Sequence, residues 1–206
     1  MEKRKAVGLT GTNLTNSSRK HKRSAVDLYS TPPDVTKALI SFLDLPSCAK
    51  VWECACGEGM MARTISSYGY TVFSTDLHDH GYGVGETDFL IQDQSYGCEW
   101  IVTNPPFSLS MQFIEKALWM MEFRDIDGFA FLLKSQYWHA KKRLSLFYQR
   151  PPAYVLPLTW RPDFMFGERG GAPTMDVLWT VWMRCNRHAI TEYKPLGRPE
   201  RGTEVL

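Results

Sequence analysis

Four consecutive residues, Asn104-Pro105-Pro106-Phe107, are the part of this sequence best suited to chemistry. They follow the apolar run 100–103, so we expect a turn at the end of a buried strand. The two prolines fix φ and remove two backbone donors, which predicts a stiff corner with outward-facing carbonyl groups. The amide of Asn104 lies on one side of this corner and the ring of Phe107 on the other. Two oxygen acceptors beside an aromatic ring suit the exocyclic amino group of a flat heterocycle, so the corner predicts methylation of a nucleobase amino group.

A second candidate site is a short turn between a predicted strand and a predicted helix, Glu53-Cys54-Ala55-Cys56-Gly57-Glu58-Gly59. Its glycines let the backbone approach a ligand, and the N–H groups of the following helix point towards it. The turn lacks both the three-glycine dinucleotide fingerprint and a phosphate loop. Asp76, after the next predicted strand, could accept hydrogen bonds from two ribose hydroxyl groups, and Asp88 from an adenine amino group. Together they indicate a ligand with ribose and adenine but no pyrophosphate, although each residue alone also fits an ordinary surface turn.

Alternating elements must position these two sites. Strands are predicted at 49–53, 70–75, 100–103, 128–133, 153–156 and 177–183, and helices at 32–43, 60–68, 111–123 and 137–148. Thr31 is the expected N-cap of the first helix. This alternation predicts an α/β fold with an open, mostly parallel sheet and helices on both faces. Ligands of such sheets bind beyond the carboxyl ends of the strands, where Glu53, Asp76, Asp88 and Asn104 would meet.

With these landmarks in this order, the chain resembles the class I S-adenosylmethionine-dependent methyltransferases, and within them the amino-methyltransferases of DNA. The resemblance covers about residues 26–184, and Gly59 and Asn104 are 45 positions apart. This order is similar to the γ arrangement, which is seen mostly in N6-adenine enzymes. The resemblance implies a Rossmann-like, seven-stranded sheet, S-adenosylmethionine as cofactor, DNA as partner and no metal. It also implies that the target base flips out of the duplex and stacks on Phe107 during direct in-line transfer.

The resemblance further implies roles for individual residues. The catalytic residues are Asn104, Pro105, Pro106 and Phe107. The cofactor-binding residues are Tyr29, Thr31, Glu53, Cys54, Ala55, Gly57, Gly59, Asp76, Leu77, Asp88, Phe89 and Asn104. Among them, Thr31 is expected to bond the methionine carboxylate, Glu53 to lie near the methionine amino group, and Phe89 to pack on the adenine.

The substrate side departs from the usual pattern of the family. Members with this order usually carry a large target-recognition domain, but only about seventy residues follow the predicted strand 128–133 here. The substrate-binding candidates are Phe107, Tyr137, Trp138, Lys141, Lys142, Arg143, Trp160 and Arg161. The loop that holds Trp160 and Arg161 is expected to line the substrate cleft; the alternative is that its aromatic side chains pack beneath a hairpin. The recognised DNA site is therefore expected to be short, and the compact build is similar to that of phage enzymes.

The composition of the 206 residues predicts one catalytic domain, 26–190, between a basic arm, 1–25, and a C-terminal tail, 191–206. The arm holds seven Lys or Arg residues and one acidic residue, which suggests contact with a polyanion or a solvated tail. No apolar run approaches the roughly 20 residues of a membrane span, and no secretory signal is evident. Five cysteines with a single C-x-C pair indicate reduced thiols rather than a zinc site. We therefore expect a cytoplasmic protein.

Several alternatives stay open at this point. Cytosine N4, an RNA adenine and a protein glutamine amide also offer a planar amino nitrogen. A non-catalytic DNA-binding module could retain the same fold. A nicotinamide oxidoreductase is disfavoured because the pyrophosphate loop is missing. The sequence does not specify the recognised DNA site, the strand preference or the oligomeric state.

Overall fold

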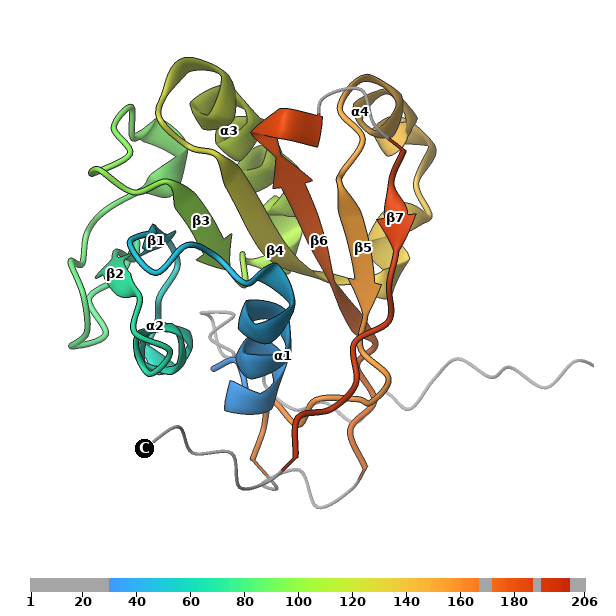
Figure 1. Cartoon of the computed structure of the whole chain (residues 1–206), viewed down its shortest axis with the longest axis horizontal. Coiled ribbons are helices and arrows are strands. Elements are labelled where there is room, and N and C mark those ends of the chain that lie inside the picture. Colours follow the sequence, from blue (N-terminus) through green and yellow to red (C-terminus); the bar gives the residue numbers. More distant parts are fainter. Residues whose placement is uncertain (1–29, 167–171, 187–189, 201–206) are drawn as a thin grey trace, which may run out of the picture.

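A seven-stranded sheet lies at the centre of the computed structural model, which describes residues 30–166, 172–186 and 190–200 (Figure 1). Its strands are β1 (Lys50–Glu53), β2 (Thr71–Ser74), β3 (Trp100–Thr103), β4 (Gly128–Lys134), β5 (Tyr154–Pro157), β6 (Val177–Met183) and β7 (Glu192–Tyr193). The α-helices are α1 (Pro33–Leu43), α2 (Met60–Ser66), α3 (Ser110–Phe123) and α4 (Leu144–Gln149). Short 3-10 helices are η1 (Phe89–Ile91), η2 (Phe107–Leu109), η3 (Ser135–Trp138), η4 (Lys141–Arg143) and η5 (Arg184–Asn186).

The order of the strands in the sheet is β2-β1-β3-β4-β6-β5-β7. Strand β6 runs antiparallel to β4 and β5, and the other neighbouring pairs are parallel. This confirms the predicted open, mostly parallel α/β sheet. From β1 the chain moves outward to β2 and then returns to β3 on the opposite side of β1. The direction of winding therefore reverses between β1 and β3, and such a reversal opens a crevice at the carboxyl ends of the strands.

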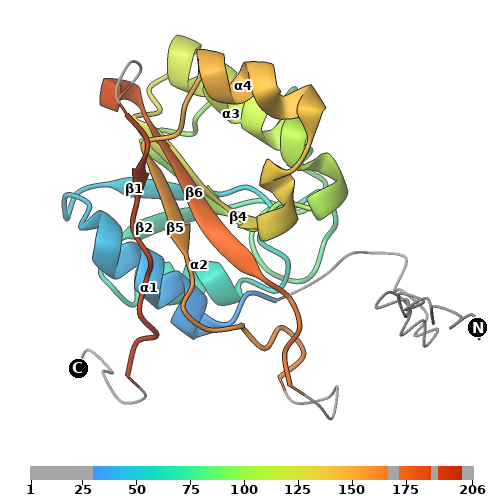
Figure 2. The same ribbon diagram turned by 90° about the vertical axis from the view of Figure 1, so that its right-hand side faces the viewer.

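Helices cover both faces of this sheet (Figure 2). On one face, α1 and α2 enclose a core that includes Leu39, Val51 and Leu132. On the other, α3 and α4 enclose a core that includes Phe113 and Phe129. Because β4 is covered on both sides, its sequence is continuously apolar rather than alternating. None of the helices in the described part of the chain is long and apolar enough to cross a bilayer.

Two predicted helix features were wrong. The expected helix 137–148 is divided into η3, η4 and α4, because Ala140 is extended, with φ −143° and ψ 119°. The guanidinium of Arg143 bonds the carbonyl of Tyr137, the oxygen that a continuing helix would have used. The first helix begins at Pro33 with Pro32 as its N-cap, and Thr31 caps nothing. The hydroxyl of Thr31 is engaged with Asn104 instead.

The segment expected as a C-terminal tail, 191–206, begins inside the domain. Its first residues form β7, which pairs in parallel with β5 through Tyr154↔Glu192 and Val155↔Tyr193. Beyond β7, Leu196 is 8% exposed and belongs to the core beneath α1. A two-residue edge strand with both side chains exposed has no apolar periodicity, so the sequence pattern could not reveal it.

Candidate active site

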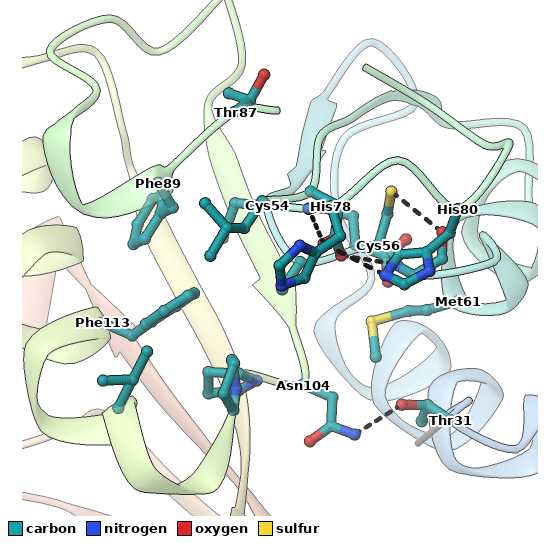
Figure 3. Close-up of a pocket in the computed structure, with 18 of the residues that line it drawn as sticks. Thr31, Cys54, Cys56, Met61, His78, His80, Thr87, Phe89, Asn104 and Phe113 are labelled. Carbon is teal, nitrogen blue, oxygen red and sulfur yellow. Dashed lines mark hydrogen bonds and ion pairs between the residues drawn. The ribbon is translucent and has the colours of Figure 1, made fainter. Parts of the chain in front are cut away.

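A cavity of about 350 Å³ lies at the carboxyl ends of β1, β2 and β3, where the winding of the sheet reverses (Figure 3). That volume is within the range of small-molecule sites. The cavity brings the proline corner and the glycine turn together. The predicted residues that line it are Thr31, Glu53, Cys54, Ala55, Gly57, Asp76, Leu77, Asp88, Phe89, Asn104, Pro105, Pro106 and Phe107. Tyr29 lies outside the described residues, as does the arm 1–25.

The amide of Asn104 is held in one orientation. Its Nδ2 donates to the Oγ1 of Thr31 at 3.1 Å, and its Oδ1 lies on the side away from Thr31 (Figure 3). Oδ1 is buried and accepts no hydrogen bond from the residues that the structure describes. Within this described part, the carbonyl of Pro105 likewise has no N–H donor, whereas that of Pro106 accepts from Leu109 at 2.9 Å. The corner therefore presents two oxygen acceptors that no described donor occupies.

Glu53 places a carboxyl group deep in the opposite wall. Its side chain is 2% exposed, and Oε2 has no hydrogen-bond partner among the described residues. Burial raises the pKa of this carboxyl well above its ordinary value, and the charge of Asp76 adds to this effect. A hydrogen bond with the backbone of Ala62 lowers the pKa but does not cancel the rise. An orphaned buried carboxyl oxygen is costly, and a cationic ligand group would satisfy it. The wall therefore fits the ammonium of a methionine tail.

Asp76 ties the glycine turn to the loop after β2. Its Oδ2 accepts from the N–H of Gly57 at 2.8 Å, and its Oδ1 accepts from the N–H of His78 at 2.9 Å. The ring of His80 approaches Oδ1 at 3.7 Å. The carboxylate is thus fixed in place, and each oxygen keeps lone-pair capacity for a further donor such as a ribose hydroxyl.

Gly59 does not line the cavity, contrary to the expectation that it lets the backbone approach a ligand. It has φ +81°, and a Cβ added there would lie 2.2 Å from the ring of Tyr82. The guanidinium of Arg63 covers that ring at 4.4 Å from its centroid. Glycine is required here because the backbone is left-handed and because Tyr82 occupies the space of a side chain.

The far end of the cavity has an aromatic wall. Phe89 is 2% exposed and packs edge-on against Trp52, with ring centroids 5.2 Å apart. It also contacts Phe113 in a tilted arrangement, with ring centroids 4.9 Å apart. The Oδ1 of Asp88 accepts from the N–H of Leu90 at 2.9 Å and so caps η1. A rigid aromatic surface beside a carboxylate suits a planar base with an amino group.

Several lining residues were missed by sequence reasoning, among them Met61, His78, His80, Leu90 and Phe113. The His-x-His pattern that begins two residues after Asp76 was a usable signal for two of these residues. The others lie on helices whose apolar residues are not distinguishable from core residues in a sequence.

The thiols in the wall are neutral groups. Burial and then the charge of Glu53 raise the pKa of Cys54 well above its ordinary value, and the same causes raise the pKa of Cys56 to about 12. Within the described residues, no group of three or more His, Cys, Asp or Glu side chains is arranged to hold a metal ion.

The cavity does not include the substrate-binding candidates beyond Phe107. Tyr137 is buried and bonds the sulfur of Met111 at 3.3 Å. Trp138 stacks on Phe147, with centroids 4.2 Å apart, and lines a separate hollow next to β5 and β7. Three further candidates lie on the 3-10 helix η4, where Lys141 and Lys142 are exposed and Arg143 stacks on the ring of Tyr137. The last two lie in the loop after β5, where Trp160 packs against the core and Arg161 forms an ion pair with Asp176 at 2.7 Å.

No protein-family model and no curated protein sequence matches the chain, but solved structures match its fold. A type I restriction-modification methyltransferase subunit from Streptococcus thermophilus superimposes with TM-score 0.62 at 12% identity, over 81% of this chain and 47% of that one. A putative class I S-adenosylmethionine-dependent methyltransferase from Listeria monocytogenes superimposes with TM-score 0.58 at 12% identity, over 87% of this chain and 68% of that one. A dimethyladenosine transferase from Plasmodium falciparum superimposes with TM-score 0.53 at 15% identity, over 76% of this chain and 63% of that one.

These comparisons define the class of the fold. The chain has the Rossmann-like α/β fold of class I S-adenosylmethionine-dependent methyltransferases. It spans about half the length of the restriction-modification subunit. The cavity lies at the edge of the sheet where this fold class places its ligands.

Proposed function

We propose that this chain transfers a methyl group from S-adenosylmethionine to the N6 amino group of adenine in DNA. The observation that carries the proposal is the pair of unoccupied acceptors, Oδ1 of Asn104 and the carbonyl of Pro105, in one cavity with the orphaned carboxyl of Glu53. The first pair suits an amino group that will be methylated. The carboxyl suits the cationic end of the methyl donor.

Named residues would hold the cofactor. Glu53 would accept from the methionine ammonium, and the hydroxyl of Thr31, while accepting from Asn104, can still donate to the methionine carboxylate. Asp76 would accept from the ribose hydroxyls, and Asp88 and Phe89 would face the adenine. S-adenosylmethionine supplies an electrophilic methyl group on its sulfonium.

The corner would activate the target nitrogen. The lone pair of an adenine amino group is delocalised into the ring, so the nitrogen is a poor nucleophile. Oδ1 of Asn104 and the Pro105 carbonyl would accept its two hydrogens and thereby favour a pyramidal nitrogen whose lone pair faces the methyl group. Because both acceptors are fixed before the substrate arrives, little reorganisation is needed. Alignment of donor and acceptor adds an effect of about 7–11 kcal/mol.

Access to the cavity and the comparisons support a flipped nucleotide of DNA as the substrate. A base within a duplex cannot enter a cavity at the strand ends, so the target nucleotide must flip out, and the half-exposed ring of Phe107 would stack on it. The name of one similar protein, a dimethyladenosine transferase, supports methyl transfer to adenine. The name of another, a restriction-modification methyltransferase subunit, supports a DNA substrate.

The proposal is tested by supplying the purified chain with labelled S-adenosylmethionine and, in parallel, DNA, RNA and cell protein. Nucleoside mass spectrometry of the DNA is expected to show N6-methyladenine, with no N4-methylcytosine. Label that enters only RNA or protein would overturn the choice of substrate. Failure to bind S-adenosylmethionine in calorimetry would overturn the enzymatic proposal and favour a non-catalytic module.

A further inference from the structure

Two segments on either side of the proline corner differ in charge. Residues 53–88, which include the carboxyl ends of β1 and β2, contain six Asp or Glu residues and one Arg. Residues 134–149, which run from the last residue of β4 through α4, contain four Lys or Arg residues and no Asp or Glu. Figure 1 shows β1 and β2 on one side of β3, and β4, where the second segment begins, on the other. The acidic segment lies on the side proposed for a cationic cofactor, and the basic segment on the side left for the substrate.

Lys134 is the cation of the basic segment that lies next to the proline corner. It is the last residue of β4, and its Nζ lies over the ring of Phe107, 4.2 Å from the centroid. Among the described residues it makes no ion pair. The carboxylate of Asp176 precedes Val177, the partner of Lys134 in the sheet, but it pairs with Arg161 at 2.7 Å. A positive charge with no described counter-ion thus lies at the entrance to the corner.

We propose that Lys134 is a substrate-binding residue that contacts the backbone phosphate beside the target nucleotide. The inference rests on the proposed function, because it places the target base on Phe107. An ammonium over this ring is close to where the sugar and phosphate of a stacked nucleotide would lie. Cation–π contacts at partly exposed sites are weak, so the ammonium can exchange the ring for a phosphate oxygen.

The charge of Lys134 also bears on the class of substrate. An ammonium without a counter-ion favours a polyanion over a neutral glutamine amide. The exposed side chains of Lys141 and Lys142 on η4 add to the same charge. The basic segment therefore selects a nucleic acid, with Lys134 as the contact nearest the reacting base.

The test compares Lys134→Met, Lys134→Gln and Lys134→Arg with the wild type. A matched control is Lys116→Met, which removes a similar cation–π contact, 4.3 Å from the ring of Trp119 on α3. DNA affinity is measured at several salt concentrations between about 50 and 200 mM, the range over which phosphate contacts dominate. Affinity for S-adenosylmethionine is measured on every variant to establish that it is folded.

The neutral variants at position 134 are expected to lower the slope of log affinity against log salt by about 0.9 on duplex DNA or about 0.7 on single strands. They should raise the KM for DNA of any sequence, while Lys134→Arg and Lys116→Met retain the wild-type slope. If a folded neutral variant keeps the wild-type slope, or loses only kcat, the inference is overturned. The proposed function would still stand if the wild type methylates DNA. If the wild type methylates no nucleic acid, both the proposed function and the inference about Lys134 are overturned.

Discussion

The amide Nδ2 of Asn104 donates to the hydroxyl of Thr31 at 3.1 Å, across 73 positions of sequence. Asn104 follows β3, and Thr31 directly precedes Pro32, the N-cap of α1. Thr31 is 4% exposed, so water does not compete effectively for this bond. The hydrogen bond fixes which end of the amide faces the cavity and leaves Oδ1 as the acceptor. The segment before α1 therefore orients the amide group of the proline corner.

Thr31→Val is expected to lower kcat roughly 100-fold, because small misplacements of a reacting group have effects of that size. Valine has the shape of threonine but cannot accept from Asn104, so the amide is free to rotate. Thr31→Ser, which keeps the hydroxyl, should retain most of the activity. Single-turnover methyl transfer at saturating S-adenosylmethionine separates this effect from weaker cofactor binding. An unchanged rate for Thr31→Val would show that the bond does not orient Asn104.

Glu53→Gln is expected to weaken S-adenosylmethionine binding while making the free protein more stable near neutral pH. The raised pKa of Glu53 means that its ionisation opposes folding. Its contribution to stability is present below the ordinary value of 4.5 and is lost as pH rises through the raised pKa. Glutamine removes this loss but also removes the negative charge that the ammonium requires.

The same reasoning predicts that cofactor affinity rises with pH until Glu53 is ionised, and that binding releases a proton. Calorimetry in buffers of different ionisation enthalpy measures that proton. Glu86→Gln, at an exposed position, is the control and should alter neither stability nor affinity. Cofactor binding by Glu53→Gln with wild-type affinity and pH dependence would exclude Glu53 as the partner of the ammonium.

Gly59→Ala should destabilise the protein by more than Gly69→Ala. Both glycines have positive φ, +81° and +89°, so both substitutions carry the strain of a left-handed residue, about 1–2 kcal/mol. Only the Cβ at position 59 would overlap the ring of Tyr82, whereas nothing lies within 4 Å at position 69. Thermal unfolding measures the difference, and Tyr82→Ala in the Gly59→Ala background should reduce it. Equal losses at the two positions would mean that Tyr82 imposes no constraint.

Local patterns predicted six of the seven strands and the main polar residues of the cavity. Strand β3 and Asn104 are adjacent in sequence, and Asp76 follows an apolar run, so residue type and spacing placed both at the carboxyl edge. The contacts that the sequence could not reveal join distant segments. Thr31 was expected to cap α1 but binds Asn104, and Gly59 makes room for Tyr82 rather than for a ligand.

The substrate side was less predictable for a related reason. The helical pattern of 137–148 is real, but Arg143 takes the carbonyl of Tyr137 and divides the segment. Lys134 ends a strand whose continuous apolar pattern gave no indication of a nearby ring. Neither contact leaves a periodic pattern in the sequence, so neither could be predicted from it.

The most direct test of the central claim is the rate of methyl transfer to DNA by Asn104→Ala, measured in a single turnover with S-adenosylmethionine bound. Removing one preorganised acceptor is expected to lower the rate about 100- to 1,000-fold or more. Affinity for S-adenosylmethionine should remain near that of the wild type, because Glu53, Asp76 and Phe89 are untouched. A variant that binds the cofactor and methylates DNA at nearly the wild-type rate would contradict the role assigned to the proline corner.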